Sequence, residues 1–190
     1  MKVFDQQIGQ FIKAASSSAP TPGGGSIAAL GAALGASMGS MVANLSTGPK
    51  FTHVQTRMNE IAANLQRSIH DFECFAQQDM DSFNRFMAAL KLPKETADER
   101  TERTAQLQSA AVQAAEVPLH LMKNCRDVMG ILEEASDQFN KNVISDLGVA
   151  VISLDAAIQS AWLTVTINLS AIKNTAIKKS YHHGNSYGKN

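Results

Sequence analysis

Little in this sequence suggests disulfides, metal sites or nucleic acid binding. The chain has two cysteines, and Cys74 and Cys125 match no metal-binding or redox spacing, so we expect reduced, buried thiols. Its 17 acidic residues balance its 17 basic ones without a basic run, which lacks the electrostatic footprint of a nucleic-acid-binding protein. The histidines His53, His70 and His120 are isolated, without a partner at ligand spacing. We therefore expect no metal and no nucleic acid partner.

The sequence also lacks the signatures of export and of membrane insertion. The first residues contain no apolar h-region, which indicates a cytoplasmic protein. Residues 27–45 are uncharged and nearly long enough to span a bilayer. They are dominated by alanine, glycine and serine rather than by leucine, isoleucine and phenylalanine, so insertion into lipid would be poor. We expect this segment to be the buried central helix of a soluble domain.

What the sequence does contain is helical periodicity almost throughout. Apolar residues recur every three or four positions in segments near 4–12, 26–45, 52–90, 96–132 and 142–173, and no strand-like alternation interrupts them. These segments predict an all-α, up-and-down bundle of about five long antiparallel helices. We assign residues 1–175 to one domain, and 176–190, which have no periodicity, to a frayed or disordered tail.

The most distinctive stretch is the glycine turn, residues 20–26, which reads Pro20-Thr21-Pro22-Gly23-Gly24-Gly25-Ser26. Its prolines exclude a helix through the turn, its glycines let backbone N–H groups approach a ligand, and Ser26 is predicted to cap the next helix. Such a turn suits ligand oxygens or a carboxylate, although it can also be purely structural. Behind it, three glycines spaced by four predict close packing of a neighbouring helix or of a second copy of the chain, or contact with a flat ligand: Gly31, Gly35 and Gly39.

Two carboxylates stand out, one in an apolar stripe and one on the sparsely charged last helix. Asp79 occupies a position in the apolar stripe of residues 52–90 where a core residue is expected. Asp146 lies near the start of the last helix, where stabilisation of the helix dipole is an alternative role. A pair of carboxylates facing one pocket would suit general acid/base work or a cationic intermediate.

Several motifs in order resemble the cyclodeaminase/cyclohydrolase family, which includes the cyclodeaminase domain of formiminotransferase-cyclodeaminase and stand-alone methenyltetrahydrofolate cyclohydrolases. Besides the glycine turn, the matching motifs are Met41-Val42-Ala43-Asn44-Leu45, Leu92-Pro93-Lys94, Val117-Pro118-Leu119, Asn142-Val143-Ile144-Ser145-Asp146 and Ile167-Asn168-Leu169. The resemblance covers about residues 4–175. It implies an all-α homodimer with folate sites near the subunit interface, a tetrahydrofolate derivative as substrate, and no permanently bound cofactor, metal or nucleotide.

The resemblance also implies roles for individual residues. Asp79 would move protons, and Asp146 would share this task or bind the amino-pyrimidine edge of the pterin. The remaining site residues would bind substrate: Pro22, Gly23, Gly24, Gly25, Ser26, Asn44, Lys50, Ser145 and Asn168. Among them, the turn amides and Asn44 would hold folate oxygens, and Lys50 is the nearest group for the glutamate tail.

The activity implied is that of a tetrahydrofolate one-carbon enzyme. We favour a methenyltetrahydrofolate cyclohydrolase, which interconverts 5,10-methenyltetrahydrofolate and 10-formyltetrahydrofolate, because the chain contains no formiminotransferase domain. One alternative is a formimidoyltetrahydrofolate cyclodeaminase, which releases ammonia from 5-formiminotetrahydrofolate. A folate-binding helical dimer with impaired catalysis is a second, because residues 48–51 carry less positive charge than the family's usual loop. A membrane-associated helical protein is a third.

Overall fold

The computed structural model describes residues 3–174 as an all-helical chain. A 3₁₀ turn, η1 (Val3–Asp5), precedes the short helix α1 (Ile8–Ala15), and a second, η2 (Lys141–Val143), precedes the last helix. The four long helices are α2 (Gly24–Asn44), α3 (Gln55–Leu90), α4 (Ala97–Glu134) and α5 (Ile144–Ala171). The all-α prediction is confirmed, with four long helices and a short fifth. The assigned tail, residues 176–190, lies outside the described residues.

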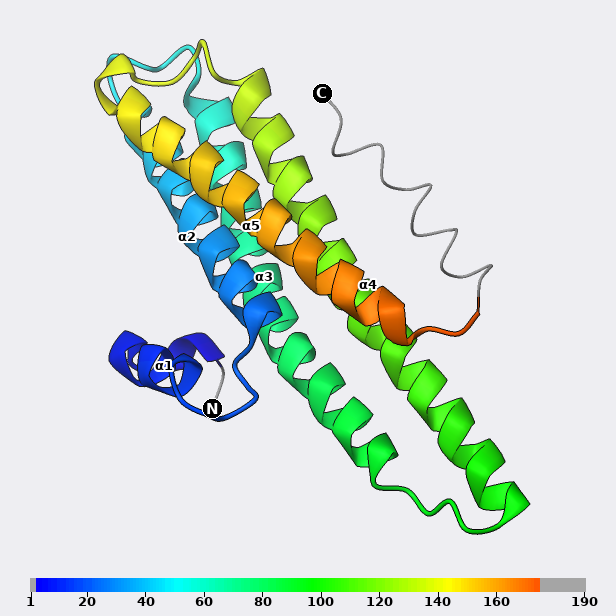
Figure 1. The fold of residues 1–190 in the computed structure, drawn as a ribbon. Coiled ribbons are helices and arrows are strands. Elements are labelled where there is room, and N and C mark those ends of the chain that lie inside the picture. Colours follow the sequence, from blue (N-terminus) through cyan, green and yellow to red (C-terminus); the bar gives the residue numbers. More distant parts are fainter. Residues whose placement is uncertain (1–2, 175–190) are drawn as a thin grey trace.

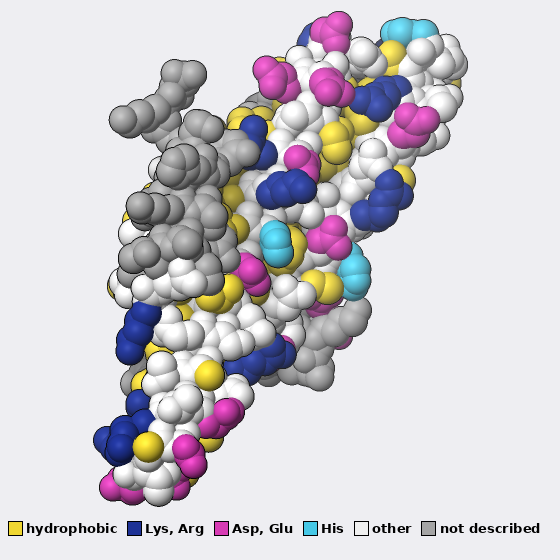
Figure 2. Space-filling model, turned by 90° about the vertical axis from the view of Figure 1, so that its right-hand side faces the viewer, with side chains coloured by type: hydrophobic (Ala, Val, Ile, Leu, Met, Phe, Trp, Pro, Cys, Tyr) yellow, Lys and Arg dark blue, Asp and Glu magenta, His cyan; other side chains and the backbone are white. Residues whose placement is uncertain are grey.

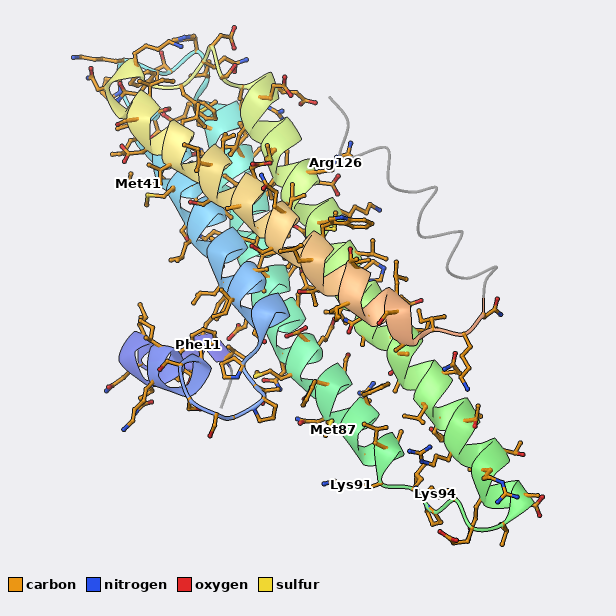
Figure 3. All side chains as sticks on the ribbon, in the orientation of Figure 1. Phe11, Met41, Met87, Lys91, Lys94 and Arg126 are labelled. Carbon is orange, nitrogen blue, oxygen red and sulfur yellow. The ribbon has the colours of Figure 1, made fainter. Side chains whose placement is uncertain are left out.

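The long helices run alternately up and down (Figure 1). Helix α2 packs against α3 and α5, and α4 packs against the same two, so α2 and α4 lie diagonally across the bundle. The core between them combines small residues from α2 with larger ones from the other helices, among them Ala32, Ala36, Leu65, Phe72, Leu121, Val128 and Leu154. The short helix α1 lies beside the N-terminal end of α2 and anchors itself through the buried Phe11 (Figure 3).

Close packing explains two of the three regularly spaced glycines. A Cβ at Gly35 would lie 3.0 Å from the backbone oxygen of Ala150, so this glycine lets α5 approach α2. A Cβ at Gly39 would lie 3.1 Å from a methyl carbon of Leu132 on α4. A Cβ at Gly31 would meet nothing within 4 Å, so no described residue of the same chain packs closely on this glycine, and packing against a second copy stays a prediction. Gly31 lies half-buried on α2, on a side that no helix among residues 3–174 contacts closely.

Helices α3 and α4 are longer than the other two and project beyond them as a hairpin (Figure 1). With 36 and 38 residues, at a rise of about 1.5 Å per residue, they measure roughly 55 Å, against about 32 Å for the 21 residues of α2. Lys91 and Lys94 lie in the connecting loop at the tip (Figure 3). A capping box opens α4, because Thr96 Oγ1 accepts from the Glu99 amide and Glu99 Oε2 accepts from the Thr96 amide.

The outer faces of the bundle differ in character. The face seen in Figure 2, on the side where α4 lies in Figure 1, carries acidic, basic and histidine side chains interspersed. By contrast, α2 and α5 expose an apolar face, which we define as Ile27, Leu34, Val149, Ile152, Leu163 and Ile167. Both helices are also long and apolar enough to span a membrane by length and composition, but 61% of the α2 window is buried inside the protein, against 22% of the α5 window.

Candidate functional site

A cavity of about 320 Å³ lies where the N-terminal end of α2 meets the middle of α3 and the C-terminal part of α5. We call this end of the bundle the cavity end. Its walls come from the glycine turn and from all four long helices: Pro20, Thr21, Gly23, Gly24, Gly25, Asp79, Phe83, Phe86, Ala111, Ala114, Thr164, Ile167, Asn168 and Ala171. The lining is mostly apolar, and Asp79 is its one ionisable side chain within the described part of the chain.

Asp79 is held by the first turn of α2. Both the backbone amide and the hydroxyl of Ser26 donate hydrogen bonds to Asp79 Oδ2, each at 2.9 Å. The helix begins at Gly24 with Gly23 as its N-cap and no side-chain cap, so the prediction that Ser26 caps this helix is wrong. Ser26 lies inside the first turn, where amides have no acceptor within the helix, and the carboxylate of Asp79 accepts from one of them.

Two opposing effects act on the pKa of Asp79. Partial burial raises the pKa above its ordinary value of 3.8, because desolvation disfavours the charged form. The two hydrogen bonds from Ser26 lower the pKa, because they stabilise the carboxylate, but burial is the larger effect. A carboxyl with a raised pKa in an apolar cavity is suited to exchange a proton with a bound molecule.

The same carboxylate requires a glycine at position 25. A Cβ at this position would collide with the Cγ and both oxygens of Asp79. Only glycine therefore lets the carboxyl group sit over the first turn of α2. Thr21–Pro22, just before this turn, is a cis peptide bond. Pro22 itself does not line the cavity, but it lies between the lining residues Thr21 and Gly23.

Asn168 reaches the cavity from α5. Its side-chain Nδ2 donates to the backbone oxygen of Ala114 on α4 at 2.6 Å, which ties these two helices together and leaves the amide oxygen outside that bond. Thr164, one turn earlier on α5, lies close to Gly24. The family resemblance assigned Asn168 to the site but did not assign Thr164.

Two phenylalanines on α3 were also missed as site residues. Phe83 and Phe86 follow Asp79 at i+4 and i+7, so they lie on the same helix face and line the cavity. That spacing was visible in the sequence, but an apolar stripe reads equally well as core. Flat aromatic walls beside a carboxylate fit a planar, partly apolar ligand.

The other predicted site residues lie at the opposite end of the bundle, which we call the distal end. Asn44 ends α2, Lys50 lies in the loop that follows, and Ser145 and Asp146 begin α5. At about 1.5 Å per residue, the 21 residues of α2 place Asn44 roughly 30 Å from the glycine turn. Within one chain, the structure therefore brings together the glycine turn, Asp79 and Asn168, and leaves Asn44, Lys50, Ser145 and Asp146 outside the cavity.

Among residues 3–174, the cavity is lined by no cluster of metal ligands and by no cysteine. No group of three or more His, Cys, Asp or Glu side chains is placed to hold a metal ion in this part of the chain. Cys125 is buried in the core, and burial raises the pKa of its thiol to about 12. That thiol is therefore inert at neutral pH.

The chain is similar to known proteins over most of its length. The model of the formiminotransferase-cyclodeaminase family matches residues 7–185. A methenyltetrahydrofolate cyclohydrolase of Methylorubrum extorquens is 36% identical over 173 residues, covering 90% of this chain and 83% of that protein. The formimidoyltransferase-cyclodeaminase of Rattus norvegicus is 31% identical over 182 residues, covering 95% of this chain but 34% of that protein. The chain thus spans about a third of the length of this longer relative.

A solved structure has the same fold. The crystal structure of formiminotetrahydrofolate cyclodeaminase from Thermotoga maritima superposes with a TM-score of 0.86 at 27% identity. The match covers 96% of this chain and 87% of the other.

Proposed function

Because the chain belongs to the formiminotransferase-cyclodeaminase family, we propose that it is a methenyltetrahydrofolate cyclohydrolase, interconverting 5,10-methenyltetrahydrofolate and 10-formyltetrahydrofolate. The substrate is a tetrahydrofolate derivative, and the reaction uses no permanently bound cofactor or metal. This activity is favoured because the cyclohydrolase of Methylorubrum extorquens is matched over most of its own length. The alternative is a formimidoyltetrahydrofolate cyclodeaminase, which the name of the similar crystal structure favours.

The observation that carries this proposal is the partly buried carboxyl of Asp79 in a cavity with aromatic and glycine walls. Hydrolysis of the methenyl group adds water to a cationic carbon between two nitrogens and then breaks one carbon–nitrogen bond. A carboxylate beside that carbon stabilises the cation and can accept the proton of the attacking water. Once protonated, it can return the proton to the departing nitrogen. Asp79 fits both steps.

Purified protein should be incubated separately with 5,10-methenyltetrahydrofolate and with 5-formiminotetrahydrofolate. The methenyl absorbance and the release of ammonia are then compared with the spontaneous rates. Accelerated loss of methenyl absorbance supports the cyclohydrolase, whereas ammonia release with a gain of methenyl absorbance supports the cyclodeaminase. If neither rate exceeds the spontaneous one in folded protein, both enzyme activities are ruled out in favour of a binding protein.

We propose further that the protein is a homodimer, formed through the apolar face of α2 and α5. Ile152, Leu163 and Ile167 expose 71%, 72% and 68% of their surface along one side of α5. Because α2 and α5 pack side by side, we expect their exposed apolar residues to adjoin and form one surface of a kind that marks an interface. A second copy supplies a matching surface, since a two-fold axis pairs a patch with itself.

Such a dimer would also bring the two ends of the bundle together. Ile167 belongs to both the apolar face and the cavity wall, and Asn44 and Ser145 are exposed at the distal end of the same two helices. A two-fold axis that reverses the direction of α5 would place the partner's distal end beside the cavity. We propose that each folate site combines one cavity end with the distal residues of the partner: Asn44, Lys50, Ser145 and Asp146.

Light scattering in detergent-free buffer tests the dimer. We expect the mass of a dimer, and a monomer for Ile152→Asp, because a buried unpaired charge opposes association. Met87→Asp is the matched control, since Met87 is exposed on the α3–α4 hairpin, away from the apolar face. A wild-type monomer would contradict the dimer, and aggregation relieved only by detergent would favour a membrane-associated protein over the cytoplasmic one we propose.

A further inference from the structure

We propose that Ser26 is a positioning residue: it fastens Oδ2 of Asp79 to the first turn of α2 and leaves Oδ1 to act on the substrate. This inference rests on the proposed function, and it changes the assigned role of Ser26 from contact with the ligand to support of the acid/base group. Ser26 does not line the cavity, whereas Asp79 does. Its side chain therefore reaches a bound molecule only through the carboxyl group.

The two carboxylate oxygens of Asp79 differ in their hydrogen bonds. The Ser26 amide and hydroxyl both point at Oδ2, each at 2.9 Å, and no described residue donates a hydrogen bond to Oδ1. The hydroxyl also lies 3.3 Å from the backbone oxygen of Ala76. Because a hydroxyl has a single proton, the shorter contact to the carboxylate is the one that it satisfies. Oδ2 is thus held by Ser26, and Oδ1 is available to contact a substrate.

The surroundings make Ser26 the main polar influence on this group. Ser26 is fully buried, and Gly25 next to it leaves room for the carboxyl where any side chain would collide. No other ionisable side chain from α2, α3, α4 or α5 lines the cavity in the described part of the chain. The next charged residues along α3, Asp81 and Arg85, line a separate groove between α3 and α4, together with Glu116 and His120.

This arrangement predicts what happens when the hydroxyl is removed. Its hydrogen bond favours the ionised carboxylate, so Ser26→Ala raises the pKa of Asp79. If Asp79 acts as a base, the acidic limb of the pH profile moves to higher pH. If Asp79 acts as an acid, the basic limb moves in the same direction. A residue with a merely structural role would lower activity without moving either limb.

The first experiment measures kcat/KM of methenyltetrahydrofolate hydrolysis against pH for wild type and Ser26→Ala. We expect a limb displaced to higher pH and a loss of about tenfold at the wild-type optimum, as for one hydrogen bond to a charged group. Ser40→Ala is the matched control, because Ser40 is also buried on α2 but bonds Gln66 instead. Unmoved limbs in Ser26→Ala would overturn the proposal.

A second measurement needs no turnover. Carbon-13 NMR of protein labelled at aspartate carboxyls follows the titration of Asp79, with its signal assigned from its loss in Asp79→Asn. We expect the titration of Asp79 to move to higher pH in Ser26→Ala and to stay in place in Ser40→Ala. If wild type has no folate activity but the titration moves, the proposed function fails and the positioning role stands; an unmoved titration overturns the role.

A double-mutant cycle completes the test. If Ser26 acts only through the carboxylate, Ser26→Ala should reduce the residual activity of Asp79→Asn by less than about twofold. A further tenfold loss would show that Ser26 acts independently, against the proposal. Should Ser26→Ala fail to fold by circular dichroism, Ser26→Cys keeps the volume with a weaker donor and should give the same direction of shift.

Discussion

The two ends of the bundle carry similar kinds of residue in very different settings. At the cavity end, Asp79 is partly buried, accepts two hydrogen bonds and faces an apolar cavity. At the distal end, Ser145 and Asn44 are exposed to solvent, and Asp146 is half-buried at the start of α5. The cavity end thus contains a pocket, whereas the polar groups of the distal end do not line that pocket.

The difference teaches that a set of residues placed together by family resemblance need not meet within one chain. About 30 Å of α2 separates the two groups. The apolar face of α2 and α5 lies between them, however, and it is the face through which a second copy would associate. The two ends then become complementary halves of one site rather than alternatives.

The largest expected effect comes from the two carboxylates. Asp79→Asn should lower kcat/KM by about 10²–10⁴-fold, because a general acid/base group is lost. Asp146→Asn should cost roughly tenfold or more if it binds the substrate through a charged hydrogen bond. Asp155→Asn is the control, since Asp155 is exposed on α5 and bonds Gln159. Wild-type kinetics in both Asp79→Asn and Asp146→Asn, with folded protein, would remove the site assignment altogether.

Mixed dimers separate a shared site from two independent ones. If one site takes Asp79 from one subunit and Asp146 from its partner, mixing Asp79→Asn with Asp146→Asn regenerates one intact site per heterodimer. Random reassociation at equal amounts should then restore about a quarter of wild-type activity. The control mixes Asp79→Asn with the double variant, which regenerates no intact site. No recovery, despite heterodimers detected by mass, would mean that both residues act in the same subunit or not at all.

A smaller effect concerns the close packing of α2 against α5. Gly35→Ala should destabilise the protein by about 1–3 kcal/mol, because its Cβ would press on the backbone of α5. Gly130→Ala on α4 is the counterpart: nothing lies within 4 Å of its Cβ, so helix propensity should raise stability by up to about 1 kcal/mol. Urea unfolding of both variants measures this. Equal effects at the two positions would contradict the close approach of α2 and α5.

The tip of the α3–α4 hairpin does not line the cavity, so a substitution there should leave catalysis unchanged. Thr96→Ala removes one half of the capping box and should cost about 1 kcal/mol of stability. Turnover should stay within the error of wild type when measured well below the unfolding temperature. A parallel loss of kcat/KM would mean that this hairpin contributes to the cavity end.

The smallest effect is on the pH dependence of stability. Because burial raises the pKa of Asp79, the folded state keeps this proton to higher pH than the unfolded state, and stability falls as pH rises through the folded pKa. Asp79→Asn removes that dependence. Its stability relative to wild type should therefore rise between pH 3.8, the ordinary value, and neutrality. Urea unfolding at several pH values checks the sign, and a constant difference would mean that the pKa is not raised.

Much of the fold could be predicted from the sequence, because helix periodicity is a local property. The stripe across residues 52–90 predicted α3 to within three residues and identified Asp79 as a polar interruption. Small residues on α2 correctly indicated close packing at Gly35 and Gly39. Gly31 shows the limit, since equal spacing along a sequence does not say which positions face a neighbour and which face outward.

The site was harder to predict because it depends on how the helices meet. A serine after a glycine run is typical of an N-cap, and only the approach of α3 reveals that Ser26 instead holds Asp79. Phe83 and Phe86 fit a core stripe and a cavity wall equally well until the end of α5 is placed. The separation of Asn44 and Asp146 from Asp79 follows from the bundle topology, which no single motif encodes.

The unequal lengths of the helices have a consequence for the local unfolding of the protein. Past the end of α5, where Gln108 bonds the backbone of Ala171 and Lys173, the α3–α4 hairpin has lost the other two helices as neighbours. Its amides should therefore exchange with deuterium through local opening, at a lower free energy than those around Leu65 and Leu154. The hairpin and the bundle should behave as separate cooperative units, with Phe86 of the cavity wall near their boundary.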